Sequence, residues 1–427
     1  MTQDIALRAD ALYKVFGRRP KEAVERLRAG ADRAEITDLG TAAVIDASFE
    51  VKKGEIFVVM GLSGSGKSTL IRMLNGLLDI TAGEVTVGGD RITGIPAKKL
   101  REIRRSRISM VFQHFALLPH RTVLDNVAYG LEIQGVPRAQ REAKAREVVE
   151  LVGLGGWDDK LPSQLSGGMK QRVGLARALA ADTDVLLMDE AFSALDPLIR
   201  REMQEQLLEL QSELGKTIVF ITHDLNEAMF LGDRIAVMRD GRIVQIGTPE
   251  EILTDPANDY VEQFVQDVDR ARVLTADSVM EPARPVVPAT GGPRAALKTM
   301  RDLQTSAAFV VGRDKKIRGV VTDRAAMKLV RAGESDLSSI LTDDYSAVNA
   351  QTPLFELFIP AVETPLPLAV TDDAGKLLGV VPRVTLLAAL GGGSTATGEI
   401  SLPEQPLPLP ADVIDDLLAD ENVKETR

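Results

Sequence analysis

Cysteine is absent from the 427 residues, so the chain forms neither a disulfide nor a thiolate metal site. Aromatic residues are scarce too, at 4%. No uninterrupted apolar run approaches the roughly 20 residues that a membrane-spanning helix needs, and the first residues, MTQDIALRAD, carry acids where a signal peptide would be apolar. We therefore expect any role at a membrane to require a partner.

An excess of basic residues is also missing. The formal net charge is -11, which argues against binding of nucleic acid by the protein as a whole. Hydrophobic residues make up 44% of the chain and charged residues 26%, a balance typical of a globular protein with a large core. The length predicts more than one domain.

Glycine and serine, by contrast, are concentrated in GLSGSGKST at residues 61–69. The stretch lies between EIFVVM, which predicts a buried strand, and KSTLIRMLNGLL, which predicts a helix. It fits the phosphate-loop pattern G-x-x-x-x-G-K-[ST], in which backbone N–H groups point at phosphate oxygens, the lysine contacts the β- and γ-phosphates and the hydroxyl ligates Mg²⁺. The predicted nucleotide-binding residues are Gly61, Leu62, Ser63, Gly64, Ser65, Gly66, Lys67, Ser68 and Thr69.

Two acids follow a second apolar run in DVLLMDEAFSALD. The run predicts a buried parallel strand, and ligands of open α/β sheets bind at the carboxyl ends of such strands. We expect Asp189 to hold Mg²⁺, directly or through water, and Glu190 to accept a proton from an attacking water molecule. Alone, the two acids would be interpreted as a polar strand end, but the phosphate loop favours the catalytic role.

A second pair of glycines stands at a predicted helix start in LSGGMKQR, residues 165–172. Ser166 is a good N-cap, and the helix N-terminus at Gly167 and Gly168 makes a second anion site. One triphosphate does not need two such sites on one chain. We therefore expect this second site to serve the nucleotide of a neighbouring subunit.

These motifs, with SALD and the histidine in VFITHD, together resemble the ATP-binding subunit of ABC transporters over roughly residues 5–265. The resemblance implies an α/β P-loop NTPase domain that hydrolyses ATP with Mg²⁺, in a head-to-tail homodimer with two ATP molecules at its interface. It implies that Gln113 contacts Mg²⁺ and the attacking water, that His223 contacts the γ-phosphate, and that Asp196 couples the two sites. On its own, His223 would be interpreted as a hydrogen-bonded strand-end histidine.

The early segment YKVFG offers Phe16, with Tyr13 as the substitute, for the aromatic that stacks on adenine in this family. The connection from Phe16 to the phosphate loop, RRPKEAVERLRAGADRAEITDLGTAAV, is longer than usual for the family. Its apolar positions predict an inserted amphipathic helix. A surface insertion without a functional role is the alternative.

The second half contains a weak repeat, since GVVTDRAAMKLV from Gly319 recurs as GVVPRVTLLAAL from Gly379. Each copy follows a predicted strand and a short turn, and the pair resembles tandem CBS modules. The threonine–aspartate spacing with which such modules often hold adenine nucleotides is not kept, because Thr322 is followed at that spacing by Ala325. We predict an ABC ATP-binding domain at 1–270, a smaller α+β tandem CBS domain at 271–395 and a flexible acidic tail at 396–427, in which Val413, Leu417 and Leu418 share one side of a short helix.

An importer ATPase with a long insertion before the phosphate loop and a CBS pair after the core resembles the glycine betaine/proline betaine (quaternary amine) uptake group. That resemblance implies ATP-driven import of quaternary amines as osmoprotectants, with regulation by the CBS pair. The implied partners are an integral membrane permease and an extracytoplasmic substrate-binding protein, with this chain as a peripheral subunit at the cytoplasmic face of the inner membrane.

Three alternatives remain at this point. The first is an importer ATPase for another small solute. The second is a non-transport ABC ATPase, but such proteins usually carry two ATPase cores or a long coiled-coil insert, and this chain has one phosphate loop and no such insert. The third is a pure nucleotide-sensing module, which Glu190 disfavours because a sensor needs no general base.

Overall fold

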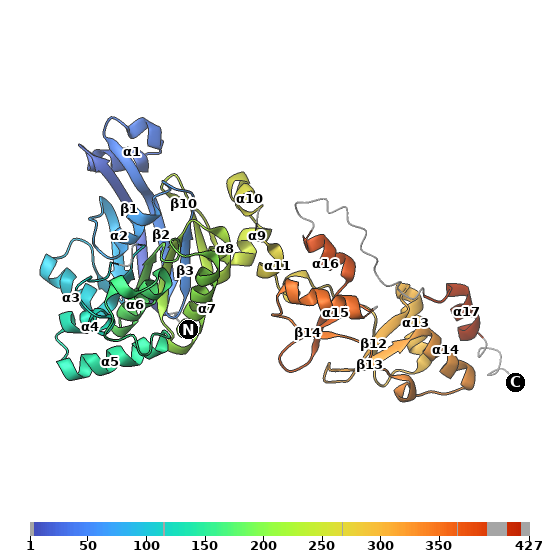
Figure 1. The fold of residues 1–427 in the computed structure, drawn as a ribbon. Helices are drawn as coiled ribbons and strands as arrows, with labels where there is room; N and C mark the ends of the chain where they lie inside the picture. The colour runs from blue at the N-terminus through green and yellow to red at the C-terminus, as the bar shows by residue number, and fades with distance from the viewer. Residues whose placement is uncertain (1–3, 114–115, 267, 365, 391–407, 420–427) are drawn as a thin grey trace. The chain divides into compact units, whose positions relative to one another are not determined.

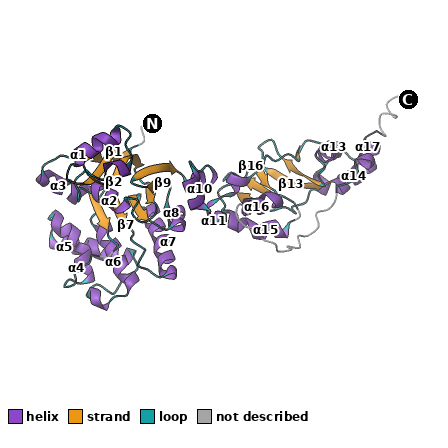
Figure 2. Cartoon of the chain, turned by 90° about the horizontal axis from the view of Figure 1, so that it is seen from above, coloured by secondary structure: helices purple, strands orange, loops and turns teal. Residues whose placement is uncertain are grey.

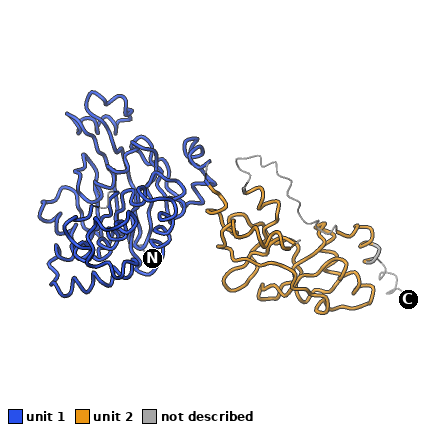
Figure 3. Tube along the Cα trace, viewed as in Figure 1, with its two compact units in different colours: residues 1–268 blue, residues 269–427 orange. Residues whose placement is uncertain are grey.

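The computed structural model describes residues 4–113, 116–266, 268–364, 366–390 and 408–419. The chain separates into two compact units, Met1–Val268 and Asp269–Arg427 (Figure 3). Among the described residues, no helix combines the length and the apolar character that crossing a membrane would require.

The first unit is built on a six-stranded sheet in the order β10-β9-β3-β8-β7-β6. Figure 1 labels β3 and β10 of this sheet. Neighbouring strands are parallel, except for the antiparallel hairpin of β9 and β10. The three central strands are buried along their whole length, which explains their continuous apolar sequences. The strands are β3 (Ile56–Met60), β6 (Ile108–Val111), β7 (Val185–Asp189), β8 (Thr217–Thr222), β9 (Arg234–Arg239) and β10 (Arg242–Gly247).

A second, antiparallel sheet of the same unit has the order β2-β1-β4-β5. Its strands are β1 (Ile5–Gly17), β2 (Gly40–Lys52), β4 (Ala82–Val87) and β5 (Asp90–Arg91). The helices of the unit include a group, α4 to α6, that lies together (Figures 1 and 2). The helices are α2 (Lys67–Leu74), α3 (Ala97–Arg107), α4 (Val123–Gln134), α5 (Arg138–Leu151), η2 (Pro162–Gln164), α6 (Gly167–Ala180), α7 (Pro197–Leu214), α8 (Leu225–Leu231), α9 (Pro249–Thr254) and α10 (Asp259–Val265).

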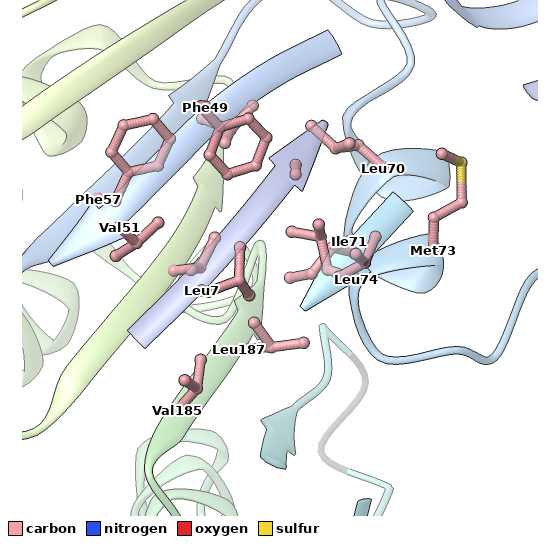
Figure 4. Close-up of a cluster of buried hydrophobic side chains, with 14 of the residues drawn as sticks. Leu7, Phe49, Val51, Phe57, Leu70, Ile71, Met73, Leu74, Val185 and Leu187 are labelled. Carbon is pink, nitrogen blue, oxygen red and sulfur yellow. The ribbon is translucent and has the colours of Figure 1, made fainter. Parts of the chain in front are cut away.

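The core of this unit fixes the helix that follows the phosphate loop. Leu70, Ile71 and Leu74 of α2 are buried in one cluster with side chains of both sheets (Figure 4). In the same cluster the rings of Phe49 and Phe57 stack with their centroids 5.0 Å apart. Because interiors are packed at crystal-like density, a helix anchored this way holds its N-terminus in place.

The insertion after β1 folds as predicted into an amphipathic helix, α1 (Pro20–Arg28), followed by a 3₁₀ turn, η1 (Arg33–Ile36). Ala23, Val24 and Leu27 are buried in a small cluster that also includes Ile36 and Leu39. The insertion thus has a core of its own against the antiparallel sheet and is not a loose surface loop.

The second unit consists of two modules of matching topology. In each module the first strand pairs in parallel with the second, and the second pairs antiparallel with the third. Each third strand leads into a helix, so the repeat seen in the sequence is also a repeat of structure. The elements are α11 (Arg270–Val273), α12 (Ala276–Val279), β11 (Val286–Pro288), α13 (Pro293–Leu303), β12 (Ala307–Val311), β13 (Ile317–Thr322), α14 (Asp323–Ala332), η3 (Ser338–Ile340), β14 (Ala347–Asn349), η4 (Leu354–Leu357), α15 (Phe358–Glu363), β15 (Leu368–Thr371), β16 (Leu377–Val381) and α16 (Arg383–Leu390).

The tail, for which the sequence predicts flexibility from residue 396 and a short helix, contains the helix α17 (Ala411–Ala419), and this helix is docked. Ile414, only 2% exposed, joins the buried cluster of the first module with Leu297 and Met300. The buried face is therefore centred on Ile414 and not, as predicted, on Val413 with the two leucines. Leu418 packs partly against the same cluster; the side chain of Leu417 and residues 391–407 and 420–427 lie outside the description.

Two polar contacts support the docking of this segment. The Leu409 N–H donates to Asp323 Oδ2 at 2.7 Å, and Arg301 Nη2 lies 2.9 Å from Asp415. Asp323 is buried, so the Leu409 amide satisfies a carboxylate oxygen that would otherwise lack a partner.

We expect Ile414→Ala to loosen this docking. Loss of the buried methyl groups costs roughly 2–4 kcal/mol unless the site collapses around the gap, so the Leu409 amide should exchange with solvent at least about tenfold faster. Hydrogen exchange of that amide is the measurement. Val413→Ala, which truncates the adjacent and less buried side chain, is the matched control; equal exchange in both variants would show that Ile414 does not hold α17 in place.

Candidate active site

The site lies where three parallel strands end. The register pairs Met60 of β3 with Thr222 of β8 and Asp189 of β7 with Ile221 of β8. The next residue after each strand is therefore brought to the same edge of the sheet. Those residues are Gly61, Glu190 and His223.

The lysine of the phosphate loop, Lys67, is hydrogen-bonded to the backbone of the same loop. Lys67 is 5% exposed, and its Nζ donates to the carbonyl oxygens of Gly61 at 2.7 Å and Leu62 at 3.0 Å. Burial lowers the pKa of Lys67, while the charges of Glu190 and Asp189 oppose that shift. Gly66 has φ 105°, and a Cβ there would lie 2.2 Å from the Ala43 carbonyl oxygen, so only glycine fits.

Two oxygen-bearing side chains that could hold a metal ion, Ser68 of the loop and Asp189 of β7, lie next to each other. Ser68 Oγ donates to Asp189 Oδ1 at 3.4 Å. Burial raises the pKa of Asp189, while the charge of Arg72 opposes the shift. A hydroxyl and a carboxylate suit Mg²⁺, which is commonly held by one or two carboxylates together with substrate phosphates. The pair fits the metal that the sequence predicts.

The three predicted catalytic side chains, Gln113, Glu190 and His223, meet at the carboxyl end of β7, where Glu190 directly follows the strand. Glu190 Oε2 lies 3.2 Å from His223 Nδ1 and accepts from Gln113 Nε2 at 3.4 Å. Glu190 has φ 47°, an uncommon conformation for a residue with a side chain, and such local strain is concentrated at functional sites. Its backbone N–H donates to the Ile221 carbonyl at 3.0 Å, which fixes this geometry.

A cavity of about 450 Å³ joins the loop to Glu190 and His223, and Gln113 is not among its lining residues. It contains two residues that the sequence did not single out, Arg33 of the insertion and Ala43 of β2. No local pattern marks either residue, because both reach the cavity through the folding of the insertion and of the antiparallel sheet. The lining residues are Arg33, Ala43, Ser63, Gly64, Gly66, Lys67, Ser68, Thr69, Glu190 and His223.

The second anion site does not line that cavity. Ser166 caps α6, accepting from the Met169 N–H at 3.3 Å, and Gly167 and Gly168 form the first turn. Asp196 similarly caps α7, accepting from the Ile199 N–H at 3.1 Å. In this single chain these residues are therefore apart from the phosphate-loop cavity.

The candidate adenine-stacking residue also lies outside the cavity lining. Phe16 is 46% exposed at the end of β1, with Lys14 Nζ 4.9 Å from its ring centroid. The substitute, Tyr13, is buried in the core of the insertion with the Arg28 guanidinium 5.1 Å from its ring. Tyr13 is thus unavailable to a ligand, which leaves Phe16 as the candidate.

A parallel sheet with a phosphate loop, an adjacent acid pair and a histidine defines the class of P-loop ATPases. The family model for "ABC transporter" matches residues 44–193, and the model for "CBS domain" matches residues 276–332. The chain belongs to the ATP-binding subunits of ABC transporters, which hydrolyse ATP. The predicted fold class is confirmed.

Named relatives match most of the chain. The "Glycine betaine transport ATP-binding protein OpuAA" of Bacillus subtilis (strain 168) is 52% identical over 394 residues, covering 91% of this chain and 93% of that protein. The "Glycine betaine/carnitine transport ATP-binding protein GbuA" of Listeria monocytogenes is 51% identical over 388 residues, covering 90% and 98%. The structure of cbiO1 from Clostridium perfringens, part of the ABC transporter complex cbiONQ, is 27% identical with a TM-score of 0.50, covering 62% of this chain and 94% of that chain.

Proposed function

We propose that this chain powers the import of quaternary amines, glycine betaine and proline betaine foremost, by hydrolysing ATP. The supporting observation is the similarity to glycine betaine transport proteins, whose sequences are 51% and 52% identical to this one over at least 90% of the chain. That coverage extends well beyond the first unit, so it includes the CBS modules as well as the ATPase core.

Each residue of the site then has a chemical task. Lys67 neutralises charge on the β- and γ-phosphates, and backbone N–H groups of Gly61–Thr69 hold the phosphate oxygens. Ser68, Asp189 and Gln113 would hold Mg²⁺, which neutralises charge on the phosphates. Glu190 accepts the proton of the water whose oxygen attacks the γ-phosphorus, while the bond to the β–γ bridging oxygen breaks and ADP leaves. His223 contacts the γ-phosphate, and Phe16 stacks on adenine.

The working unit in this proposal is a head-to-tail homodimer. The separation of Ser166, Gly167 and Gly168 from the cavity of their own chain supports their action on the nucleotide of the second subunit, with Asp196 between the two sites. The further partners are an integral membrane permease and an extracytoplasmic substrate-binding protein. The chain is then peripheral at the cytoplasmic face of the membrane, with the CBS pair as the regulatory part.

The identity of the transported solute can be tested by measuring uptake in a strain that lacks the gene for this chain. We expect the wild-type chain, and not Lys67→Ala, to restore uptake of labelled glycine betaine, because loss of the lysine weakens ATP binding. Choline and carnitine, measured in parallel, test other quaternary amines. Restored uptake of an unrelated solute without restored betaine uptake would overturn the assignment of the cargo while leaving the ATPase intact.

A further inference from the structure

The insertion after β1 places a cation at the nucleotide cavity. Arg33 is the first residue of η1 and lines the cavity with Ser63, Gly64 and Lys67. Its side chain is 37% exposed, so it is accessible to a ligand. Because Lys67 Nζ donates to loop carbonyls, Arg33 is a second and differently placed positive charge at this cavity.

The backbone at Arg33 is held by polar contacts around the start of η1 and by buried side chains that follow it. Asp32 and Glu35 form a capping box, with the Asp32 N–H donating to Glu35 Oε2 at 2.8 Å. Ile36 and Leu39 are buried in the core of the insertion. Because the backbone is anchored, only the side chain of Arg33 has to move to meet a ligand.

An acid that does not line the cavity pairs with this guanidinium. Arg33 Nη1 lies 3.6 Å from Asp240 Oδ1 in the turn between β9 and β10. That turn is tied to the phosphate loop, since the Gly241 N–H donates to the Ser65 carbonyl at 3.0 Å. The Asp240 side chain is 72% exposed and also lies 3.5 Å from Arg239 Nε, so its ion pair with Arg33 is readily exchanged.

We propose that Arg33 binds the polyphosphate of the nucleotide and that Asp240 is the anion that holds the guanidinium at the cavity until the nucleotide arrives. This rests on the proposed nucleotide site at Gly61–Thr69. A guanidinium presents several N–H donors in a plane that matches phosphate oxygens, and a polyphosphate offers more negative charge than one carboxylate. The insertion is then part of the ATP site.

Binding of Mg²⁺–ATP to the full chain, measured by calorimetry with hydrolysis blocked by Glu190→Gln in every sample, tests the proposal. Arg33→Gln should raise Kd by about three- to tenfold, the range for one partly exposed charge-assisted contact. Arg33→Lys should recover part of the loss. The matched control is Arg26→Gln, which removes a charge from α1 that pairs with Glu22 and Asp38 and does not line the cavity.

Asp240→Asn should change the affinity for Mg²⁺–ATP in the opposite direction to Arg33→Gln. Asn tolerates the left-handed backbone of this position, φ 49°, so the turn is retained while the competing charge is removed. Affinity for Mg²⁺–ATP should then rise by about two- to fivefold, and the gain should vanish when Arg33→Gln is combined with it.

The outcomes separate the two proposals. If the parent chain binds no Mg²⁺–ATP, or if Lys67→Ala binds as tightly as the parent, the proposed site itself fails. If the parent binds and Lys67→Ala does not, but Arg33→Gln matches Arg26→Gln, Arg33 is a surface ion-pairing residue and this inference alone is overturned. Equal melting temperatures of the variants without nucleotide show that folding is unchanged.

Discussion

Replacing Glu190 with glutamine should stop ATP turnover while leaving ATP binding intact. The amide has nearly the same shape as the carboxylate and still meets Gln113 and His223, which lie 3.4 and 3.2 Å from the Glu190 side chain. It cannot take the proton of the attacking water, so we expect hydrolysis to fall by roughly 10²–10⁴-fold, the usual contribution of a general base. The variant should accumulate as a dimer that retains ATP.

Single-turnover hydrolysis, the Kd for ATP and the mass of the complex in solution are the three measurements. Glu205→Gln, which neutralises an exposed acid paired with Arg201 on α7, is the control for a loss of charge far from the site. Near-normal turnover in Glu190→Gln would remove this residue from its role. By contrast, Lys67→Ala should weaken ATP binding itself.

The second large effect is expected at the start of α6. Ser166→Arg places a long cation at the helix N-terminus, where the sequence predicts contact with the nucleotide of the second subunit. We expect hydrolysis to fall by at least about 10²-fold, the scale of losing preorganised donors at a transition state. Binding of ATP to each monomer should persist, because Ser166 does not line the phosphate-loop cavity.

Mixing this variant with Lys67→Ala distinguishes action within a chain from action between chains. A mixed dimer contains one site with both an intact Lys67 and an intact Ser166, so part of the activity should return. Unchanged hydrolysis in Ser166→Arg alone would show that this segment is only a helix cap.

The grouping of Gly61, Glu190 and His223 at one edge of the sheet follows from short, contiguous patterns. Each of β3, β7 and β8 is a continuous apolar run followed directly by its polar residue, and parallel pairing places those ends together. The sequence therefore predicted the neighbours Gly61, Glu190 and His223 without any long-range information.

Arg33 could not be found this way. The helix α1 that precedes it is visible from the spacing of Ala23, Val24 and Leu27. The place of Arg33 at the cavity, however, involves a turn about 200 residues further along the chain, which carries Asp240. Pairings of this kind are set by tertiary packing and leave no local signature.

The tail shows a second limit of prediction from sequence, because here the composition predicts disorder where the structure has a docked helix. Its acidic composition is typical of a mobile segment, yet α17 docks on Leu297 and Met300 of α13 through a single fully buried isoleucine, supported by Leu418 and by two polar contacts. Composition averages over such a residue, and the surface that receives it lies more than 100 residues earlier in the chain.

The docked helix α17 also constrains the order in which the protein can mature on the ribosome. The first unit ends at Val268 and contains its own core, so it can fold while the rest is still being synthesised. The first CBS module completes its hydrophobic cluster only later, because that cluster includes Ile414, which is translated after the whole of the second module. Until that residue emerges, Leu297 and Met300 lack the side chain that completes their cluster, and apolar surface left open in this way is what chaperones bind on a nascent chain.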